Sequence, residues 1–382
     1  MSMPDERSAD ARIAIVHERL TEIAGSELVT EQLAYEWPTA PIHIPIVDRR
    51  TRASFADRVE TGWLSTAYRG LDYRSYAPLL PLVPAWLRRR DFGAADAVVI
   101  SHHAFAIAAA QAAGPRPTIA YVHSPARWAW DAKMRESEAS SAAGRAALDV
   151  LSKRAIKNEL LSCGKLTTIV ANSSAVAERI ALHWGREATV VHPPVDTEFY
   201  TPDAGEPVED FFLLAGRLVP YKRPDIAIKA AIKAKVKLVV AGGGRKINDY
   251  KRIADDGDVA FLGRVSDDDL RSLQRRALAC LLPGEEDFGI VPVEAMACGT
   301  PVLAVGVGGV CDSVIDGQTG VLVTDGDDAE VIDSFATALA EFDRGSFDSA
   351  LIRQHAEGFS RAAFRRRMRT VVDQTLTARR KT

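Results

Sequence analysis

The sequence predicts an α/β fold made of two Rossmann-like domains, and three observations lead to that prediction. Short buried strands, each followed by a loop and a helix, recur along the chain. A length of 382 residues suggests two domains or one large one, and 47% hydrophobic residues are typical of a globular protein with a full core. A stretch rich in proline, residues 192–207, separates the two series of strand–helix units and is the expected linker.

The first series begins with a buried strand at 12–16, a loop that runs to Gly25, and a helix over 27–36 with Ser26 as its expected N-cap. A strand, a glycine-containing loop and a helix in this order are typical of a nucleotide-binding domain. The sequence does not place the short strands and turns of residues 38–66. The other elements expected in this series are strands at 95–101, 118–122, 165–171 and 189–192 and helices at 142–163 and 175–183.

His123 stands directly after the strand expected at 118–122. Ligands of open α/β sheets bind beyond the carboxyl ends of the strands, although a histidine there can also be a simple polar cap. Because proline, arginine and tryptophan residues accompany it, we interpret His123 as functional. His102 and His103 follow the strand at 95–101, and adjacent strand residues point to opposite faces, so we interpret these two as structural.

Arg217 and Lys222 lie in the loop after the first strand of the second series, which is expected at 211–215. Two cations at the carboxyl end of a strand suit a diphosphate, and an ordinary surface charge pair is the alternative. A helix is expected from Pro224 to Ala234. The other elements expected in this series are strands at 237–241, 259–262, 277–282 and 301–305 and helices after Ser266 and at 290–298, 331–342 and 360–378.

Three consecutive acidic residues and the helix at 290–298 lie between the last two of these strands. The N-terminus of a helix presents unpaired N–H groups and a partial positive charge, which suit phosphate. Glu286 and Glu294, separated by seven residues, are carboxylates that can each accept hydrogen bonds from two vicinal hydroxyls. Phosphate donors beside diol acceptors predict a sugar-nucleotide site. A solvated acidic loop in an ordinary βαβ unit is the alternative.

The motif Glu286-x7-Glu294, with Phe288-Gly289 inside it and Ala-Met-Ala-Cys-Gly-Thr-Pro-Val after it, resembles the signature of the retaining family 4 glycosyltransferases of GT-B fold. Residues 216–224 resemble the element of that family in which an arginine and a lysine hold the donor diphosphate. Residues 121–131 resemble its His-x-Pro segment, where the histidine faces the donor sugar. The resemblance is close over residues 210–365 and looser in the first half, where Gly25 stands alone although the family usually has two glycines. A plain tight turn is therefore the alternative role of Gly25.

The resemblance implies a domain organisation and a set of residue roles. Two Rossmann-like domains would face each other across a cleft, the first comprising residues 1–200 with a C-terminal helix, 366–382, that crosses back to it, and the second residues 207–365. The implied catalytic residues are His123, Arg217, Lys222 and Glu286. The implied donor-binding residues are Gly25, Val265, Phe288, Gly289, Ile290 and Glu294, with Glu294 on the ribose and Glu286 on the sugar.

No metal or cofactor is expected. Arg217, Lys222 and the N-terminus of the helix at 290–298 can stabilise the charge of a leaving diphosphate without one. Asp267-x-Asp269 matches a metal-binding pair, but acidic residues at the start of a helix are explained by the helix dipole.

Residues 122–131, 218–225 and 285–302 look most like those of bacterial mannosyltransferases that build O-antigen or exopolysaccharide units. That likeness implies GDP-mannose as the donor, a glycan or polyprenyl-diphosphate-linked acceptor, and retention of configuration. A UDP-sugar donor is an alternative within the same fold. A glycoside hydrolase with Glu286 and Glu294 as its carboxylate pair, or a non-catalytic sugar-nucleotide-binding subunit, is an alternative function.

The net charge, the positions of the cysteines and the lengths of the apolar runs limit the class of protein. A net charge of −3 argues against a nucleic-acid binder. The four scattered cysteines are interpreted as reduced core residues of a cytosolic protein. Residues 1–16 lack the pattern of a signal peptide. No apolar run reaches the length of a membrane span. Residues 76–90 place apolar side chains before three arginines. This segment is expected either to dock on anionic lipid at the inner membrane face or to pack inside the first domain.

Overall fold

The computed structural model describes residues 11–132, 134–135, 142–244, 246–255 and 257–380. The chain divides into two compact units: unit 1 comprises Met1–Pro194 and Phe364–Thr382, and unit 2 comprises Val195–Ala363. The ten N-terminal residues, on which part of the signal-peptide argument depends, lie outside the described residues.

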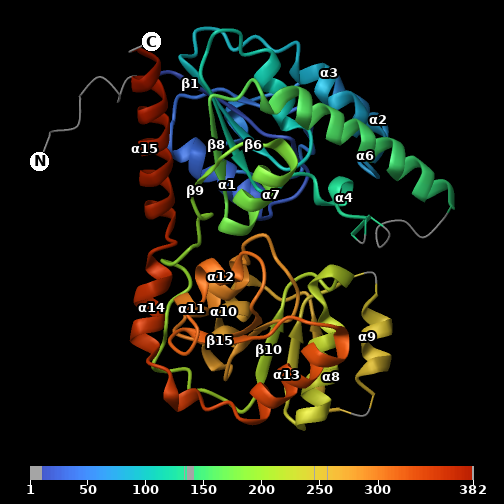
Figure 1. Ribbon diagram of the computed structural model, residues 1–382, viewed down its shortest axis with the longest axis vertical. Coiled ribbons are helices and arrows are strands. Elements are labelled where there is room, and N and C mark those ends of the chain that lie inside the picture. Colours follow the sequence, from blue (N-terminus) through green and yellow to red (C-terminus); the bar gives the residue numbers. More distant parts are fainter. Residues whose placement is uncertain (1–10, 133, 136–141, 245, 256, 381–382) are drawn as a thin grey trace, which may run out of the picture. The chain divides into compact units, whose positions relative to one another are not determined.

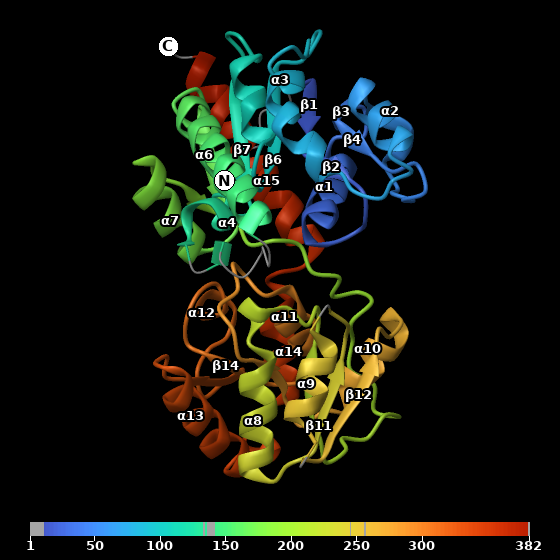
Figure 2. The ribbon, with the colours of Figure 1, turned by 90° about the vertical axis from the view of Figure 1, so that its right-hand side faces the viewer.

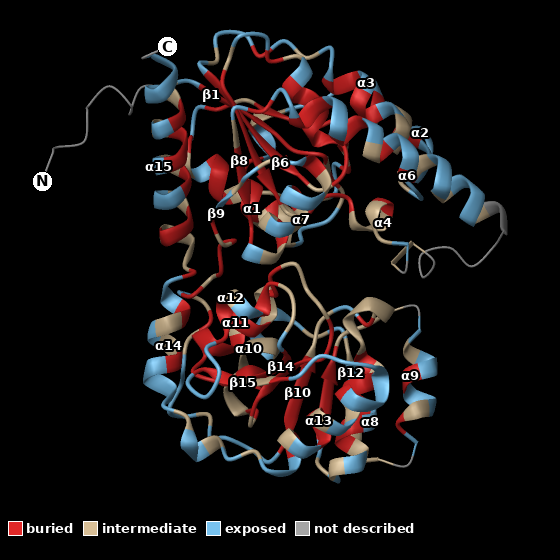
Figure 3. Cartoon of the chain, viewed as in Figure 1, coloured by how far each residue is buried: buried red, intermediate tan, exposed pale blue. Residues whose placement is uncertain are grey.

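Unit 1 is built on a seven-stranded parallel sheet with the strand order β5-β3-β1-β6-β7-β8-β9. The strands of this sheet are β1 Ile13–Val16, β3 Ile42–His43, β5 Val59–Glu60, β6 Ala97–His102, β7 Thr118–Val122, β8 Thr168–Ala171 and β9 Thr189–Val190. A small separate pair joins β2 (Arg19–Leu20) to β4 (Ile46–Val47). Every residue of β1, β6 and β7 is buried, as expected of a parallel sheet with both faces covered; Figure 3 shows this for β1 and β6.

Helices cover both faces of this sheet. They are α1 Gly25–Glu36, α2 Trp63–Gly70, α3 Val83–Leu87, α4 Arg127–Trp130, α6 Ala142–Cys163, α7 Ser174–Trp184 and α15 Arg361–Arg380. Short 3-10 turns lie at Ala56–Arg58, Ala77–Leu82 and Ala106–Gln111. Helices α2, α3, α6 and α7 contribute to the hydrophobic core on one face, and α1 and α15 contribute to the core on the other.

The C-terminal helix α15 packs in unit 1, beside elements from the start of the chain (Figure 1). Its buried side chains Phe364, Met368 and Val372 belong to the same core cluster as Leu33 of α1. The guanidinium of Arg369 donates to the carboxylate of Glu36 at the end of α1. The return of the last helix to the first domain, which the resemblance implied, is confirmed.

Two expectations for unit 1 and the cysteines are wrong. Helix α1 begins at Gly25 with Ala24 as its N-cap, not at Glu27 with Ser26 as the cap. The reason is that the carboxylate of Glu27 accepts from the backbone N–H of Ala24 at 3.1 Å, while the Ser26 hydroxyl donates to the same carboxylate. Cys311 is exposed on the short helix α12, Val310–Ser313, whereas the other three cysteines are buried.

Of the two alternatives for residues 76–90, the structure favours packing inside the domain. Leu79, Val83 and Trp86 are buried in the core of unit 1, and Leu82 is 40% exposed. The Arg90 guanidinium stacks over the Trp86 ring, with its carbon 4.0 Å from the ring centroid. No helix among the described residues has the length and apolar character needed to cross a bilayer.

Unit 2 is built on a six-stranded parallel sheet with the order β12-β11-β10-β13-β14-β15. Its strands are β10 Phe212–Ala215, β11 Leu238–Ala241, β12 Val259–Gly263, β13 Cys280–Leu282, β14 Val302–Val305 and β15 Gly320–Val323. Its helices are α8 Pro224–Ala234, α9 Ile247–Ile253, α10 Asp267–Arg276, α11 Ile290–Ala297, α12, α13 Asp328–Ala340 and α14 Ser349–Glu357 (Figure 2). Two 3-10 turns lie at Pro220–Lys222 and Arg344–Ser346.

Candidate functional site

The carboxyl ends of four neighbouring strands of unit 2 carry loops that touch backbone to backbone. A Cβ at Gly242, after β11, would lie 1.8 Å from the carbonyl oxygen of Gly216, after β10. A Cβ at Gly309, after β14, would lie 2.2 Å from the carbonyl oxygen of Asp287, after β13. A Cβ at Gly284, after β13, would lie 2.5 Å from the carbonyl oxygen of Tyr221 in the loop after β10, which joins the two pairs. These glycines are therefore required by close approach, and the four loops form one surface.

Lys222 and Glu286 meet on this surface. The Lys222 ammonium lies 2.6 Å from a carboxylate oxygen of Glu286, and both side chains are mostly buried. Burial alone would lower the pKa of Lys222, but the Glu286 carboxylate raises it above its usual value. Lys222 therefore remains a cation. The backbone of Glu286 is fixed in turn, because its carbonyl accepts from the N–H of Gly309 at 2.9 Å.

The N-terminus of α11 lies in the same chain segment as Glu286. Its N-cap is Gly289, which has φ 86° and offers no side chain to the first N–H groups of the helix. A left-handed φ at this position favours glycine, so Gly289 is explained by backbone conformation. Phe288 is buried against Phe359, with ring centroids 5.6 Å apart, and anchors the turn. The open first turn, beginning at Ile290, is suited to an anion.

Two further predicted residues lie at carboxyl ends of strands in unit 2. Arg217 follows β10 and is exposed. Val265 follows β12, is partly buried, and packs against the core cluster that contains Leu273. The sheet order places β12 and β10 on either side of β11. Arg217, the predicted cation, and Val265, the predicted contact to the nucleotide base, therefore lie along the same edge of one sheet.

Glu294 lies on α11, and the pKa of its carboxyl group is higher than usual. The pKa of its carboxyl group is raised to about 7, first because the group is removed from water and second because Asp267 is negatively charged. A carboxyl with this pKa holds its proton over much of the neutral range, although an ionised carboxylate is the better acceptor for a diol.

This pKa leads to a prediction about nucleotide binding. If Glu294 binds the ribose as a carboxylate, binding requires the loss of its proton, so affinity for a nucleoside diphosphate should rise with pH from about 6 to about 8. The rise should approach tenfold per pH unit below the pKa and level off above it. Isothermal titration calorimetry in buffers of different ionisation enthalpy measures the released proton. The Glu294→Gln variant should give a weaker and flatter profile, and an unchanged slope in that variant would assign the proton elsewhere.

The pair Asp267 and Asp269 belongs to a helix start, as predicted. Ser266 is the N-cap of α10, and its hydroxyl accepts from the backbone N–H of Asp269 at 3.1 Å. Asp268, between them, pairs with Arg271 at 2.8 Å. Within the described residues no group of three or more histidine, cysteine, aspartate or glutamate side chains has the arrangement needed to hold a metal ion.

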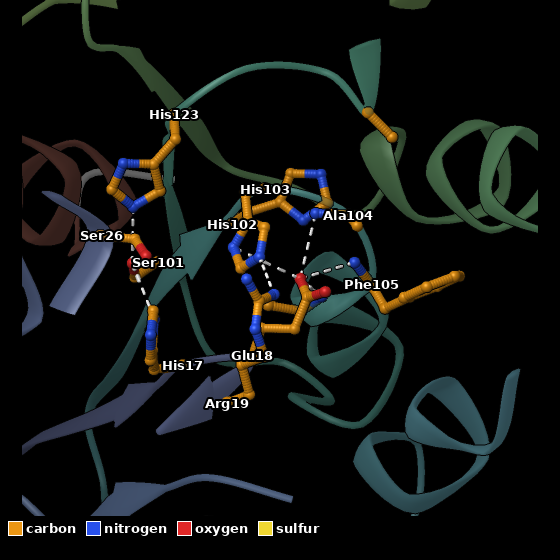
Figure 4. Close-up of polar contacts among 12 residues, drawn as sticks. His17, Glu18, Arg19, Ser26, Ser101, His102, His103, Ala104, Phe105 and His123 are labelled. Atoms are coloured by element: carbon orange, nitrogen blue, oxygen red, sulfur yellow. Dashed lines mark hydrogen bonds and ion pairs between the residues drawn. The ribbon is translucent and has the colours of Figure 1, made fainter. Parts of the chain in front are cut away.

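Unit 1 has its own polar cluster at the carboxyl ends of β1, β6 and β7, which are neighbours in the sheet (Figure 4). His17 follows β1, Ser101 lies near the end of β6, and His123 follows β7. The Ser101 hydroxyl lies 3.1 Å from Nδ1 of His17 and 2.8 Å from Nε2 of His123. Burial holds the pKa of His123 well below its usual value.

A second set of contacts lies beside the first (Figure 4). One carboxylate oxygen of Glu18 accepts from the backbone N–H groups of Ala104, Phe105 and Ala106, at 3.0, 2.8 and 3.3 Å. The same oxygen is 3.7 Å from Nδ1 of His103, and the other nitrogen of His103 contacts the Arg19 guanidinium. This carboxylate therefore fixes the chain that follows β6.

His102 and His103 differ in their surroundings. His102 is fully buried between Glu159, whose carboxylate is 3.2 Å from its Nε2, and the N–H of Ile107, which donates to its Nδ1. These contacts fit the structural role expected of it. His103 is partly exposed, with 22% of its side chain accessible, and belongs to the polar cluster with Arg19.

Unit 2 contains Arg217, Lys222, Val265, Glu286, the turn 288–290 and Glu294, and unit 1 contains Gly25 and His123. Gly25 is the first residue of α1, next to the Ala24–Glu27 contact. The sequence did not predict His17, Ser101 or Glu27 as site residues. The available signal was that His17 directly follows a buried strand, as His123 does.

Comparison with known families assigns both halves of the chain. Residues 23–199 match the family described as Glycosyltransferase Family 4, and residues 198–344 match Glycosyl transferases group 1. The two halves are glycosyltransferase domains. A D-inositol 3-phosphate glycosyltransferase of Mycobacterium tuberculosis is 38% identical over 217 residues, which cover 50% of this chain and 45% of that protein. The chain thus spans about half the length of the curated relatives it matches.

Solved structures confirm the fold. HepE from Anabaena in complex with UDP superposes with a TM-score of 0.69 at 19% identity, over 95% of this chain and 100% of that one. Sucrose-phosphate synthase from Thermosynechococcus elongatus superposes with a TM-score of 0.70 at 18% identity, over 96% of this chain and 100% of that one. At these identities the likeness concerns the fold, and the predicted GT-B fold is confirmed.

Proposed function

We propose that the protein transfers a hexosyl group from a nucleoside diphosphate sugar to a hydroxyl acceptor with retention of configuration. The observation that carries the proposal is the pairing of Lys222 with Glu286 beside the open N-terminus of α11, on the helix that also carries Glu294. A cation and a helix N-terminus suit the diphosphate, and two carboxylates suit two sets of hydroxyls.

The proposed chemistry follows from these groups. The bond between the sugar C1 and the diphosphate oxygen breaks and the acceptor oxygen bonds to C1. The proton of the acceptor hydroxyl passes to the departing diphosphate. The departing diphosphate gains negative charge, which Arg217, Lys222 and the first turn of α11 are proposed to stabilise. Glu286 is proposed to hold the sugar hydroxyls, Glu294 the ribose, and Val265 the base. His123 and Gly25 of unit 1 are proposed to act on the donor sugar and phosphate.

For the donor we propose GDP-mannose, on the likeness of residues 218–225 and 285–302 to bacterial mannosyltransferases. A UDP-sugar is the second candidate, because HepE of this fold was solved with UDP and with UDP-glucose. A thermal-shift screen with GDP, UDP and ADP and their sugars, followed by a transfer assay with the stabilising donor, tests both. The proposal predicts the largest shift with GDP-mannose, and a larger shift with a UDP-sugar would replace mannose transfer by the second candidate.

Analysis of the reaction products distinguishes the candidate acceptors and the alternative functions. A polyprenyl-diphosphate-linked glycan is the proposed acceptor, and D-inositol 3-phosphate is a second compound to test because of the name of the Mycobacterium tuberculosis relative. Proton NMR of the product gives the anomeric configuration, for which retention is expected. Release of free sugar from a glycoside without any nucleotide would indicate a hydrolase instead, and nucleotide binding without turnover on any acceptor would indicate a binding subunit.

Transfer is expected to be independent of divalent metal. The reason is that Lys222 is a cation beside the proposed diphosphate site and Arg217 lies in the same loop. Activity measured after exhaustive dialysis against EDTA should equal that of the untreated protein within about twofold. Loss of activity that manganese or magnesium restores would contradict this prediction.

A further inference from the structure

Four polar groups form a continuous line across the sheet edge of unit 1. Nε2 of His17 lies 3.4 Å from a carboxylate oxygen of Glu27, and Nδ1 of His17 lies 3.1 Å from the Ser101 hydroxyl. That hydroxyl lies 2.8 Å from Nε2 of His123. Figure 4 shows His17, Ser101 and His123 in a row. His17 and Ser101 are fully buried and Glu27 is 2% exposed, so water does not interrupt the line.

The direction of the hydrogen bonds in this line is set at its acidic end. Burial alone would raise the pKa of Glu27, but its contacts lower it, and the hydrogen bond from His17 is the largest of them. Its second oxygen is already occupied, because it accepts from the N–H of Ala24 at 3.1 Å and from the Ser26 hydroxyl at 3.0 Å. Glu27 is therefore an acceptor only, and Nε2 of His17 must donate to it.

The remaining bonds follow from the number of protons. When His17 carries a single proton, that proton is on Nε2 and Nδ1 has a lone pair, so the Ser101 hydroxyl donates to Nδ1. The hydroxyl oxygen then accepts from His123, which must carry its proton on Nε2. Nδ1 of His123, on the other side of the ring, is left with a lone pair, and His123 is partly exposed. A His17 protonated on both nitrogens would instead donate to Ser101 and give His123 the opposite tautomer, so the proposal includes a neutral His17.

We propose that Glu27, His17 and Ser101 are positioning residues that lock His123 in the Nε2–H tautomer, so that its Nδ1 accepts a hydrogen bond from a substrate hydroxyl. This inference rests on the proposed function for its substrate, but the lock itself is a property of the unliganded protein. It gives Glu27 a second task besides accepting from Ala24 at the start of α1. It also explains why a serine lies buried between two histidines at the end of a central strand.

The test reads the tautomer directly, without turnover. In the full-length protein labelled with 15N-histidine, long-range proton–nitrogen NMR distinguishes a protonated ring nitrogen from one with a lone pair, and the His123→Gln spectrum identifies the signals of His123. Wild type should show a protonated Nε2 and an unprotonated Nδ1 on His123. A protonated Nδ1 in wild type would overturn the proposal.

Glu27→Gln is the decisive variant because it reverses the line without changing its shape. The oxygen of the introduced amide can accept from Ala24 and Ser26 as before, while the amide nitrogen donates to Nε2 of His17. His17 then carries its proton on Nδ1, Ser101 donates to His123, and the proton of His123 moves to Nδ1. Ser101→Ala should give a mixture of both tautomers, and Ser101→Thr should restore the wild-type spectrum. Glu18→Gln, in the neighbouring set of contacts, is the matched control and should leave the tautomer of His123 unchanged.

Kinetics give an independent readout of the same lock. Ser101→Ala and Glu27→Gln should lower kcat about tenfold with little change in the KM of the donor, and Ser101→Thr should recover most of the loss. An unaltered His123 tautomer in both Ser101→Ala and Glu27→Gln would overturn the proposal. The expected tautomers in a protein that transfers no sugar would confirm the lock and contradict the proposed function, so the two failures are distinguishable.

Discussion

Replacing Lys222 by alanine is expected to lower the turnover of sugar transfer by roughly 10²–10³-fold. The charge of Lys222 is held in place, because its ammonium is 2.6 Å from the Glu286 carboxylate and its side chain is mostly buried. The substitution removes a cation from the site where diphosphate charge is proposed to develop. It also leaves a carboxylate without its partner, which would repel the diphosphate. Turnover and donor KM at saturating acceptor measure the effect.

Two matched variants separate these causes. Lys222→Arg keeps the positive charge and should retain more activity than Lys222→Ala. The double variant Lys222→Ala with Glu286→Gln removes the unpaired carboxylate, so its affinity for the nucleoside diphosphate should exceed that of Lys222→Ala alone. If Lys222→Ala transfers sugar at the wild-type rate, Lys222 has no part in stabilising the leaving group.

The elements that could be predicted from the sequence are those with long, simple patterns. The strand β7 and the helices α6 and α8 begin and end where the sequence predicted. The strand is an uninterrupted apolar run, α8 opens at Pro224, and Gly164 follows the last residue of α6. The strands β3, β4 and β5 were not placed. Each is two residues long, and two residues are too few to show a period.

One part of the candidate site could likewise be predicted from the sequence and another part could not. In unit 2 the contact between Lys222 and Glu286 joins two loops that the sequence motifs had each identified, although the two residues are far apart in the sequence. The line in unit 1 depends instead on the register of β1, β6 and β7, which brings His17 to Ser101 across 84 residues of sequence. Nothing in the residues around Ser101 indicates this alignment, so only the folded sheet reveals the contact. The exposure of Cys311 was not predicted, because its apolar neighbours suggest a buried position. The sequence does not show that the helix carrying it is only four residues long.

Substitution of the two glutamates by glutamine is expected to separate binding from turnover. Glu294→Gln should weaken the affinity for a free nucleoside diphosphate by roughly tenfold to a hundredfold, because a ribose contact is shared by donor and product. Glu286→Gln should lower kcat by a similar factor with little effect on that affinity, because its proposed partner is the sugar that leaves with the acceptor. Calorimetry with the free nucleotide and initial-rate kinetics with the sugar nucleotide measure the two quantities separately.

The matched control for this pair is Glu285→Gln, which changes the charge of the same loop next to Glu286 without touching either proposed role. It should keep both the nucleotide affinity and the turnover within about threefold of wild type. Glutamine is preferred to alanine at position 286 because it keeps an oxygen near Lys222 and so limits the loss to the charge of the carboxylate. Should Glu286→Gln lose affinity for the free nucleotide as severely as Glu294→Gln, Glu286 would bind the nucleotide rather than the transferred sugar, and the assignment of the two carboxylates would be wrong.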